Sequence, residues 1–460
     1  MGRVPTRVGR AALRPARQAD EIETGAVVAL THQGDGIVRG GKAVFIPGAL
    51  PGEVVRFRRT LRHRQYDDGF LLEVLEKSGA RVLPPCAHFG ICGGCALQHL
   101  APDAQLQAKE IELRENLERI ARVTALAWLP PLAGPARGYR RRARLSAKFV
   151  AKKGRVLVGF RERFKPYVSA ISTCEVLAPA AAALIEPLSE ALTALTIRAC
   201  VPQIEVSVAD NAVALVLRVL AQPSEADLQL LRSFETRHGV RLYLQDSGLD
   251  SVRRLTPVPL EEPLRYALPA FALDLEFAPT DFIQVNGRVN EALVTRAIDL
   301  LELDASSQVL DLFCGIGNFT LALARRAASA VGVEGDERLV ARARHNAERH
   351  ALGNAQFHCM DLGDSASTEA SCMHEAYSHV VIDPPRAGAR AMLPTIARLD
   401  PQRILYISCH PGSLARDIGM LVHDYGFILQ AAGVLDMFPH TMHVESLAVL
   451  DRPPARGRAA

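Results

Sequence analysis

Val309-Leu-Asp-Leu-Phe-Cys-Gly-Ile-Gly-Asn-Phe319 joins an apolar strand to a glycine turn and to a helix that we expect to begin near its last residue. Such a turn brings backbone N–H groups close to a ligand, because Gly315 and Gly317 carry no Cβ. Glu334 closes the next apolar strand, at about the distance where an acid binds the hydroxyl pair of a ribose. The stretch therefore predicts a nucleoside-binding site at the edge of a sheet.

The residue at position 320 separates two classes of nucleoside cofactor. A nicotinamide dehydrogenase would share the glycine turn and the acid, but its motif has a third glycine, whose place Thr320 takes. A single-nucleoside cofactor therefore fits better than a dinucleotide, and a glycine turn that serves only packing is the least favoured interpretation.

Strands and helices alternate around this stretch. The expected strands are Gln308–Leu312, Ala330–Glu334, Ala355–His358, His379–Asp383, Arg403–Ser408 and a last one from Gly426 onward. This alternation predicts a parallel, doubly wound Rossmann-like α/β domain, which we place at residues 276–451.

Asp383-Pro-Pro-Arg386 ends the fourth of these strands. The prolines fix the backbone and place the acidic side chain in the crevice where open α/β sheets bind ligands. Methyltransferases that act on exocyclic amines carry a similar Asn-Pro-Pro-Tyr loop. Asp and Arg replace Asn and Tyr here, which argues against amine chemistry.

Cys409 ends the fifth strand at the same ligand edge. A free cysteine is more often a small buried hydrophobe, so position alone does not establish catalysis. A thiolate beside a methyl donor would, however, supply the step that C5 of uracil needs, because attack at C6 creates an enolate that accepts the methyl group. We expect Cys409 to be this nucleophile and Cys314, inside the glycine turn, to serve packing.

A general base must then remove the C5 proton before the cysteine is eliminated. Glu445, in Phe438-Pro-His440-Thr-Met-His443-Val-Glu445, is the natural candidate. His440 and His443 remain alternatives, either as bases or as RNA contacts.

Three of the nine cysteines, Cys86, Cys92 and Cys95, are spaced C-x5-C-x2-C with two glycines between the last two. This spacing lets three thiolates converge on one centre, and Cys174 is the nearest unassigned cysteine for a fourth ligand. Zinc would accept four thiolates as well, and the spacing does not exclude it. Redox-active or free thiols are the less favoured interpretation.

Residues 21–79 contain five short β-rich segments separated by turn residues, which predicts a small closed barrel of the OB type. Its expected strands are Ala26–Leu30, Ile37–Arg39, Ala43–Pro47, Glu53–Thr60 and Phe70–Glu76. Five arginines interleaved with aromatic residues suit RNA phosphates and bases, but a solvated basic edge is equally compatible. These arginines are Arg56, Arg58, Arg59, Arg62 and Arg64.

Residues 80–275 mix strands and helices and are expected to form a central α+β domain that carries the cysteine cluster. We predict a polar helix over about Asp103–Arg122, with one apolar face. That face would hold Leu106, Leu113, Leu117 and Ile120.

Composition narrows the class of protein further. A chain of 460 residues, 48% hydrophobic and with a net charge of +4, is a multidomain protein that is only mildly basic. No apolar run is long enough to span a bilayer, and we expect a soluble, cytoplasmic monomer. Residues 1–20 have five arginines before the first acid; we favour a disordered RNA-binding arm over a transit peptide, and a disordered tail at residues 452–460.

From Thr24 to Asp451 the chain resembles the bacterial 23S ribosomal RNA uracil-C5 methyltransferases. The motifs that carry the resemblance are the four cysteines, Phe282-Ile-Gln284-Val-Asn286, Asp311-Leu-Phe-Cys-Gly-Ile-Gly-Asn-Phe319, Asp383-Pro-Pro-Arg386, Ser408-Cys409 and His440-Thr-Met-His-Val-Glu445. The chain departs from the family at His410 and Asp361, where asparagine is usual or common.

The resemblance implies a TRAM domain at residues 21–79, a [4Fe-4S] cluster on the four cysteines, a Cys409 nucleophile and a Glu445 base. It also implies a set of residues that line the S-adenosylmethionine site: Gln284, Phe313, Asn318, Glu334, Asp361 and Asp383. The expected substrate is a uridine of 23S rRNA, because relatives that act on tRNA generally lack both the barrel and the cysteines. The alternatives are another uridine of rRNA or tRNA, and a non-catalytic RNA-binding iron–sulfur protein.

Overall fold

The computed structural model describes residues 22–364 and 371–453, and the chain divides into two compact units, residues 1–79 and 80–460. The arm predicted at residues 1–20 lies outside the described residues. So does the predicted tail from residue 454 onward.

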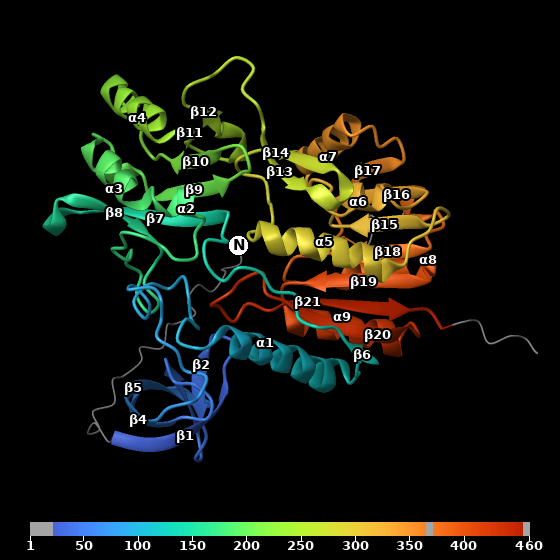
Figure 1. Ribbon diagram of the computed structural model, residues 1–460, viewed down its shortest axis with the longest axis horizontal. Helices are drawn as coiled ribbons and strands as arrows, with labels where there is room; N and C mark the ends of the chain where they lie inside the picture. Colours follow the sequence, from blue (N-terminus) through green and yellow to red (C-terminus); the bar gives the residue numbers. More distant parts are fainter. Residues whose placement is uncertain (1–21, 365–370, 454–460) are drawn as a thin grey trace, which may run out of the picture. The chain divides into compact units, whose positions relative to one another are not determined.

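The first unit is a closed five-stranded barrel with the strand order β1-β2-β3-β5-β4 (Figure 1). Its strands are β1 (Ile22–Leu30), β2 (Asp35–Val38), β3 (Ala43–Pro47), β4 (Val54–Arg62) and β5 (Tyr66–Glu76). Alternate residues such as Val44, Ile46, Val55 and Phe57 fill its interior, as the period of two along a strand requires. The predicted barrel is confirmed.

Two of the barrel's arginines bind acids within the barrel. Arg59 donates to Glu23 at 2.7 Å and to the buried Asp67 at 2.6 Å, and Arg56 pairs with Glu73 at 2.9 Å. The charge of these two guanidiniums is therefore partly neutralised by neighbouring strands.

The second unit begins with the cysteine-bearing loop and contains a six-stranded sheet in the order β12-β11-β10-β9-β7-β8. The strands are β7 (Arg142–Val150), β8 (Arg155–Gly159), β9 (Gln203–Val208), β10 (Val213–Arg218), β11 (Val240–Gln245) and β12 (Arg253–Arg254). The helices of this region are α2 (Pro179–Ala182), α3 (Ile185–Ala194) and α4 (Glu225–His238). Buried Leu188 of α3 and Leu231 of α4 share one apolar core with the sheet.

The rest of this unit contains an eight-stranded sheet, in which the strands lie side by side in the order β17-β16-β15-β18-β19-β21-β20-β6 (Figure 1). Its strands are β15 (Gln308–Leu312), β16 (Ser329–Glu334), β17 (Ala355–Cys359), β18 (His379–Ile382), β19 (Arg403–Ser408), β20 (Ile428–Leu435), β21 (Glu445–Asp451) and β6 (Ala127–Trp128). Its helices are α5 (Gly287–Leu301), α6 (Thr320–Ala324), α7 (Glu337–Arg349), α8 (Leu393–Leu399) and α9 (Pro411–His423).

Successive residues of the central strands enter two different cores. Val309 packs with α5, α6 and α7 on one face of the sheet, whereas Leu310 packs with α8 and α9 on the other. Burial on both faces explains why these strands are continuous apolar runs. The predicted doubly wound α/β domain is present.

The prediction of a purely parallel sheet is wrong at one edge. β21, which the sequence did not reveal, runs antiparallel to both β19 and β20. This reversal brings the start of β21 beside the carboxyl end of β19, where Ser446 lies opposite Ser408.

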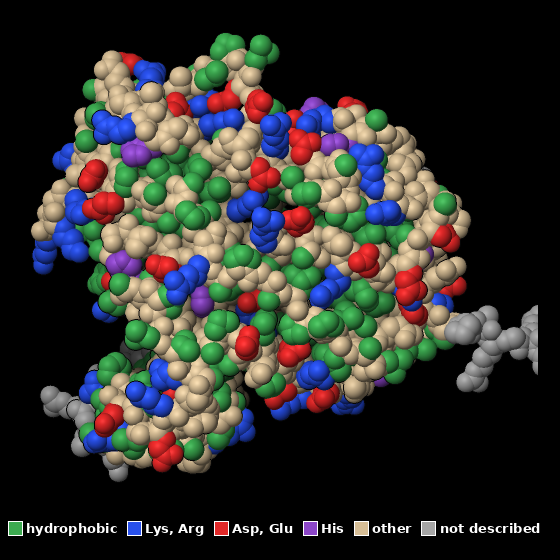
Figure 2. Space-filling model, in the orientation of Figure 1, with side chains coloured by type: hydrophobic (Ala, Val, Ile, Leu, Met, Phe, Trp, Pro, Cys, Tyr) green, Lys and Arg blue, Asp and Glu red, His purple; other side chains and the backbone are tan. Residues whose placement is uncertain are grey.

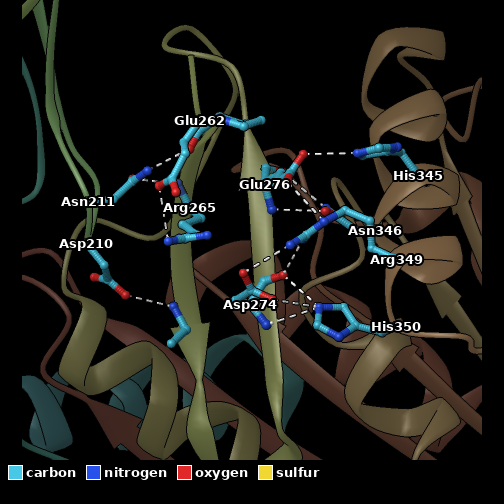
Figure 3. Close-up of polar contacts among 12 residues, drawn as sticks. Asp210, Asn211, Glu262, Arg265, Asp274, Glu276, His345, Asn346, Arg349 and His350 are labelled. Atoms are coloured by element: carbon cyan, nitrogen blue, oxygen red, sulfur yellow. Dashed lines mark hydrogen bonds and ion pairs between the residues drawn. The ribbon is translucent and has the colours of Figure 1, made fainter. Parts of the chain in front are cut away.

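The hairpin of β13 (Leu264–Leu268) and β14 (Leu273–Phe277) connects the central region to α7 (Figure 3). On one side, Asn211 accepts a hydrogen bond from the Arg265 backbone N–H at 3.2 Å. On the other, Asp274 and Glu276 bind side chains of α7, including Arg349 at 3.1 Å from the Asp274 carboxylate. These contacts help to join the two sheets into one unit.

The helix expected at about Asp103–Arg122 is α1 (Pro102–Asn116) followed by a π-helical turn, η1 (Leu117–Ala121). The prediction of the apolar face of this helix is partly wrong, because Ile120 is exposed while Gln105 and Lys109 are buried. The polar pair finds partners in the loop that precedes β21, as described below.

Lysine and arginine side chains are interspersed with acidic ones on the face shown in Figure 2, in keeping with the small net charge of the chain. Within residues 22–364 and 371–453, no helix has both the length and the apolar character needed to cross a membrane.

Candidate active site

The order of the central strands changes direction between β15 and β18. From β15 the chain proceeds through β16 to β17 on one side, whereas β18 and β19 lie on the other. Crevices in open α/β sheets lie at such a switch point, outside the carboxyl ends of the strands. Phe313 and Asp383 follow these two strands directly, and the Asp383 N–H donates to the Leu312 carbonyl at 3.3 Å.

The glycine turn adopts the backbone that its sequence predicts. Phe313, Gly315 and Gly317 have φ values of 66°, 55° and 91°, in the left-handed region that favours glycine. Glu334, at the end of β16, accepts hydrogen bonds from the backbone N–H groups of Gly315 at 3.1 Å and Gly335 at 2.7 Å. The acid therefore lies at the turn and binds its backbone.

Thr320 has a role that the sequence did not reveal. Its hydroxyl donates a 2.6 Å hydrogen bond to Asp311, which is buried beneath the turn. Burial, with a smaller contribution from the charge of Asp383, raises the pKa of Asp311 to about 7. The residue that replaces the third glycine thus binds one oxygen of a buried carboxyl group.

Asn318 and Gln284 lie on the α5 side of the turn. Asn318 exchanges two 3.0 Å amide hydrogen bonds with Asn290 of α5 and accepts a third, at 2.9 Å, from the Tyr266 hydroxyl. Gln284 lines a cavity of about 230 Å³ together with Tyr266 and Asn290. Asn318 is therefore held internally, whereas Gln284 borders open space.

Asp361 is exposed two residues beyond β17, and its carboxylate accepts a 2.8 Å hydrogen bond from the Gly363 N–H. Asp361 and Glu334 are linked through one intervening residue, because the Met360 N–H donates to the Glu334 carbonyl at 2.9 Å. Asp361 is thus an exposed residue at the same edge of the sheet as Glu334.

Cys409 and Glu445 lie at the ends of the neighbouring strands β19 and β21. Cys409 follows Ser408 and Glu445 precedes Ser446, and these two serines are paired across β19 and β21. Burial, followed by the charges of Glu445 and Asp383, raises the pKa of the Cys409 thiol to about 11. Arg386 acts in the opposite direction, so its guanidinium favours the thiolate.

Glu445 is 8% exposed, so its carboxyl group is largely removed from solvent. Burial, followed by the charge of Asp383, raises its pKa to about 8, against the opposing charges of Arg386 and Lys109. Burial also raises the pKa of Asp383 to about 7. A base with a pKa near neutral pH is suited to proton transfer from carbon.

The two histidines that remained as alternatives have different surroundings. His440 is buried, and its Nδ1 atom accepts a hydrogen bond from Gln105 at 3.2 Å. His443 is exposed and accepts a 2.9 Å hydrogen bond from Arg386. His440 therefore serves the packing of its loop.

His410, one of the two departures from the family pattern, caps α9. Its Nδ1 atom accepts a 3.1 Å hydrogen bond from the Ser413 backbone N–H. Asparagine is a preferred residue at this position because its side-chain oxygen makes the same kind of bond. Cys314, predicted to serve packing, is 4% exposed and belongs to the main apolar core.

Cys86, Cys92, Cys95 and Cys174 line one small cavity, although no three His, Cys, Asp or Glu side chains converge closely enough to hold a metal ion within the described ranges. The loop around them is closely packed. A Cβ atom on Gly93 would lie 2.9 Å from the Arg161 carbonyl, and one on Gly94 would lie 3.5 Å from the Cys92 sulfur. The four thiols thus line one cavity, and the loop backbone leaves no room for a side chain at Gly93.

Known proteins resemble this chain along most of its length. The family described as tRNA (Uracil-5-)-methyltransferase matches residues 271–453. The 23S rRNA (uracil(1939)-C(5))-methyltransferase RlmD of Xylella fastidiosa is 47% identical over 93% of this chain and 96% of its own. The proteins of the same name from Xanthomonas euvesicatoria and Stenotrophomonas maltophilia are 47% and 46% identical, with the same coverage.

A solved structure shares the fold. The tRNA (uracil-54, C5)-methyltransferase of Pyrococcus abyssi, in complex with S-adenosyl-L-homocysteine, matches 93% of this chain and 100% of its own with a TM-score of 0.71. Its sequence is 24% identical, so this likeness concerns the fold alone. The fold and the curated relatives together establish that the chain belongs to the family of 23S rRNA (uracil-C5)-methyltransferases.

Proposed function

We propose that this enzyme transfers a methyl group from S-adenosylmethionine to C5 of one uridine in 23S rRNA. The observation that carries the proposal is that Cys409 and Glu445 lie at adjacent strand ends, one residue beyond the paired Ser408 and Ser446, where the charge of Asp383 acts on both. The names of the RlmD relatives support the same substrate. Methylation of unmodified 23S rRNA, followed by mapping of the modified base, tests it; methylation of tRNA instead would select the alternative substrate.

The cofactor would occupy the crevice between β15 and β18. The donor and acceptor set there suits a nucleoside: Glu334 for the ribose hydroxyls, Phe313 as an apolar wall, and the Gly315 and Gly317 turn for close backbone approach. We assign Gln284, Asn318, Asp361 and Asp383 to the same site, with Asn318 acting through its bonds to α5. Bound S-adenosylmethionine supplies an electrophilic methyl group.

The chain's own residues would perform the remaining steps. The target uridine must first leave any base stack to reach the sheet edge. The Cys409 thiolate then bonds to C6, and the electron pair of the C5–C6 bond moves to the enolate, so that C5 accepts the methyl group. Glu445 removes the C5 proton, the double bond re-forms and the Cys409 sulfur leaves C6.

We propose that Cys86, Cys92, Cys95 and Cys174 hold a [4Fe-4S] cluster with a structural or RNA-positioning role. The common cavity lined by the four thiols supports this ligand set. Four thiolates would equally bind zinc, and metal analysis separates the two.

The parts of the chain would divide the work. We propose that residues 21–79 are a TRAM domain that adds RNA affinity, that residues 80–275 carry the cluster, and that residues 276–451 carry the chemistry. Support for the first assignment comes from the closed barrel and from its basic residues. Arg62 ends β4, and Arg64 lies in the turn that follows it. A non-catalytic RNA-binding protein is the competing function, and the presence of both Cys409 and Glu445 argues against it.

A further inference from the structure

Helix α1 contains a buried ionic group that the steps above do not use. Lys109 has no solvent-exposed side-chain surface, and its ammonium group donates to the Asp436 carboxylate at 2.6 Å and to the Phe438 carbonyl at 3.0 Å. A buried lysine is costly unless it is paired in this way. Both partners belong to the segment between β20 and β21, which leads directly to Glu445.

A second residue of the same helix binds the same segment one turn away. Gln105 is 1% exposed; its carbonyl oxygen accepts from the His440 backbone N–H at 2.8 Å, and its amide donates to the His440 ring at 3.2 Å. The His440 carbonyl in turn accepts from the backbone N–H groups of Ala96 and Leu97, both at 2.9 Å. His440 has a φ of 67°, so this backbone requires external support.

We propose that Lys109 and Gln105 are positioning residues for the base Glu445: together they fix the 436–444 segment, and the ammonium group of Lys109 favours the carboxylate form of the base. This inference rests on the proposed role of Glu445.

The charges around Glu445 give the direction of the second effect. Asp383 stabilises its protonated form, whereas Arg386 and Lys109 stabilise the carboxylate. Arg386 is exposed and also contacts His443, whereas Lys109 is buried beside Asp436, which carries the opposite charge. Loss of the Lys109 charge alone would therefore raise the pKa of Glu445 further above its present value of about 8 and reduce the fraction of active base at neutral pH, whereas loss of both charges of the pair would change that pKa little.

The proton-loss step isolates this effect. Once Cys409 is bonded to C6 of uracil its sulfur no longer titrates, so the pH dependence of proton loss reports on Glu445. Single-turnover release of tritium from RNA labelled at C5 of uridine measures that step. A denaturing gel measures the covalent protein–RNA adduct that precedes it.

Four variants separate charge, positioning and folding. Lys109→Met removes the cation alone, and Lys109→Met with Asp436→Asn removes both charges of the pair without leaving a buried carboxylate unpaired. Gln105→Leu removes the bonds to His440 without any change of charge. Lys152→Met, at an exposed turn far along the chain from α1, is the matched lysine control.

Lys109→Met should accumulate adduct, release tritium several-fold more slowly at pH 7 and show a midpoint at higher pH, because the cation that favours the carboxylate is gone. The double variant and Gln105→Leu should be slower at every pH without a shift, and Lys152→Met should match the parent. A Lys109→Met variant with the parent midpoint, or a double variant with the parent rate, overturns the inference about Lys109. Rapid tritium release by Glu445→Gln would instead overturn the role of the base, and the inference with it.

Discussion

Cys409 and Glu445 occupy opposing positions at the ends of β19 and β21, one residue beyond the paired Ser408 and Ser446. The antiparallel return of β21 creates this arrangement, because a parallel strand would place its own carboxyl end there. A nucleophile and a base contributed by neighbouring strands can act on adjacent carbons of one ring, and their substitutions should fail at different steps.

Cys409→Ala should bind RNA and cofactor but form no covalent adduct, because the thiol that attacks C6 is absent. Glu445→Gln should attack and methylate, then lose the C5 proton slowly, so that the protein stays bonded to the methylated base. A denaturing gel with labelled RNA should show a slow band for Glu445→Gln only. Methylation by Cys409→Ala at near the parent rate would refute the nucleophile assignment and make Cys314 the next residue to test.

Removal of the perturbed base should stabilise the protein at alkaline pH. The folded state raises the pKa of Glu445 from 4.5 to about 8, so it binds more protons than the unfolded state between these values, and the resulting stability is lost as pH rises. Glu445→Gln should therefore raise the free energy of unfolding by roughly 1–3 kcal/mol at pH 8. Denaturant unfolding at pH 5 and pH 8 checks this, and an equal effect at both would contradict it.

His410→Asn should leave the stability and activity of the protein near their parent values, because asparagine can accept the same hydrogen bond from Ser413. His410→Ala should cost about 1 kcal/mol of stability through the loss of the α9 cap. Thermal unfolding of both variants measures the difference. If His410→Asn lost as much stability as His410→Ala, capping would not be the role of this side chain.

Protein purified without oxygen should contain about four irons and four sulfides per chain, the composition of one [4Fe-4S] cluster. Substitution of Cys174 by serine should lower the iron content, because this residue closes the ligand set from a distant segment. Cys200→Ser, a cysteine outside the cavity, is the control. Stoichiometric zinc in place of iron would rule out the cluster.

Deletion of residues 1–79 should weaken binding to rRNA and flatten its dependence on salt, by about 0.9 in log–log slope for each phosphate that the barrel neutralises. Cofactor binding should be unchanged, because the reacting groups all lie in the second unit. An affinity and a salt slope equal to those of the full chain would show that the barrel does not bind phosphate.

The sequence predicted the elements whose residues are determined locally. Val309 and its neighbours form continuous apolar runs because both faces of the sheet are covered, and the glycine turn follows from its own composition. Contacts between distant segments were not predictable in the same way. Lys109 and Gln105 look like solvent-facing residues of a polar helix, and only the segment near residue 440 makes them internal.

Gln105 and His440 are separated by 335 residues, which makes the order of biosynthesis relevant. At roughly 5–20 residues per second, the ribosome would complete the second partner roughly 17–70 seconds after the first. Throughout that interval Lys109 and Gln105 of helix α1 lack the partners that the 436–444 segment supplies in the finished protein. Glu445 therefore cannot be positioned by α1 until β21 is being made. Chaperones can bind the unfinished chain during that period.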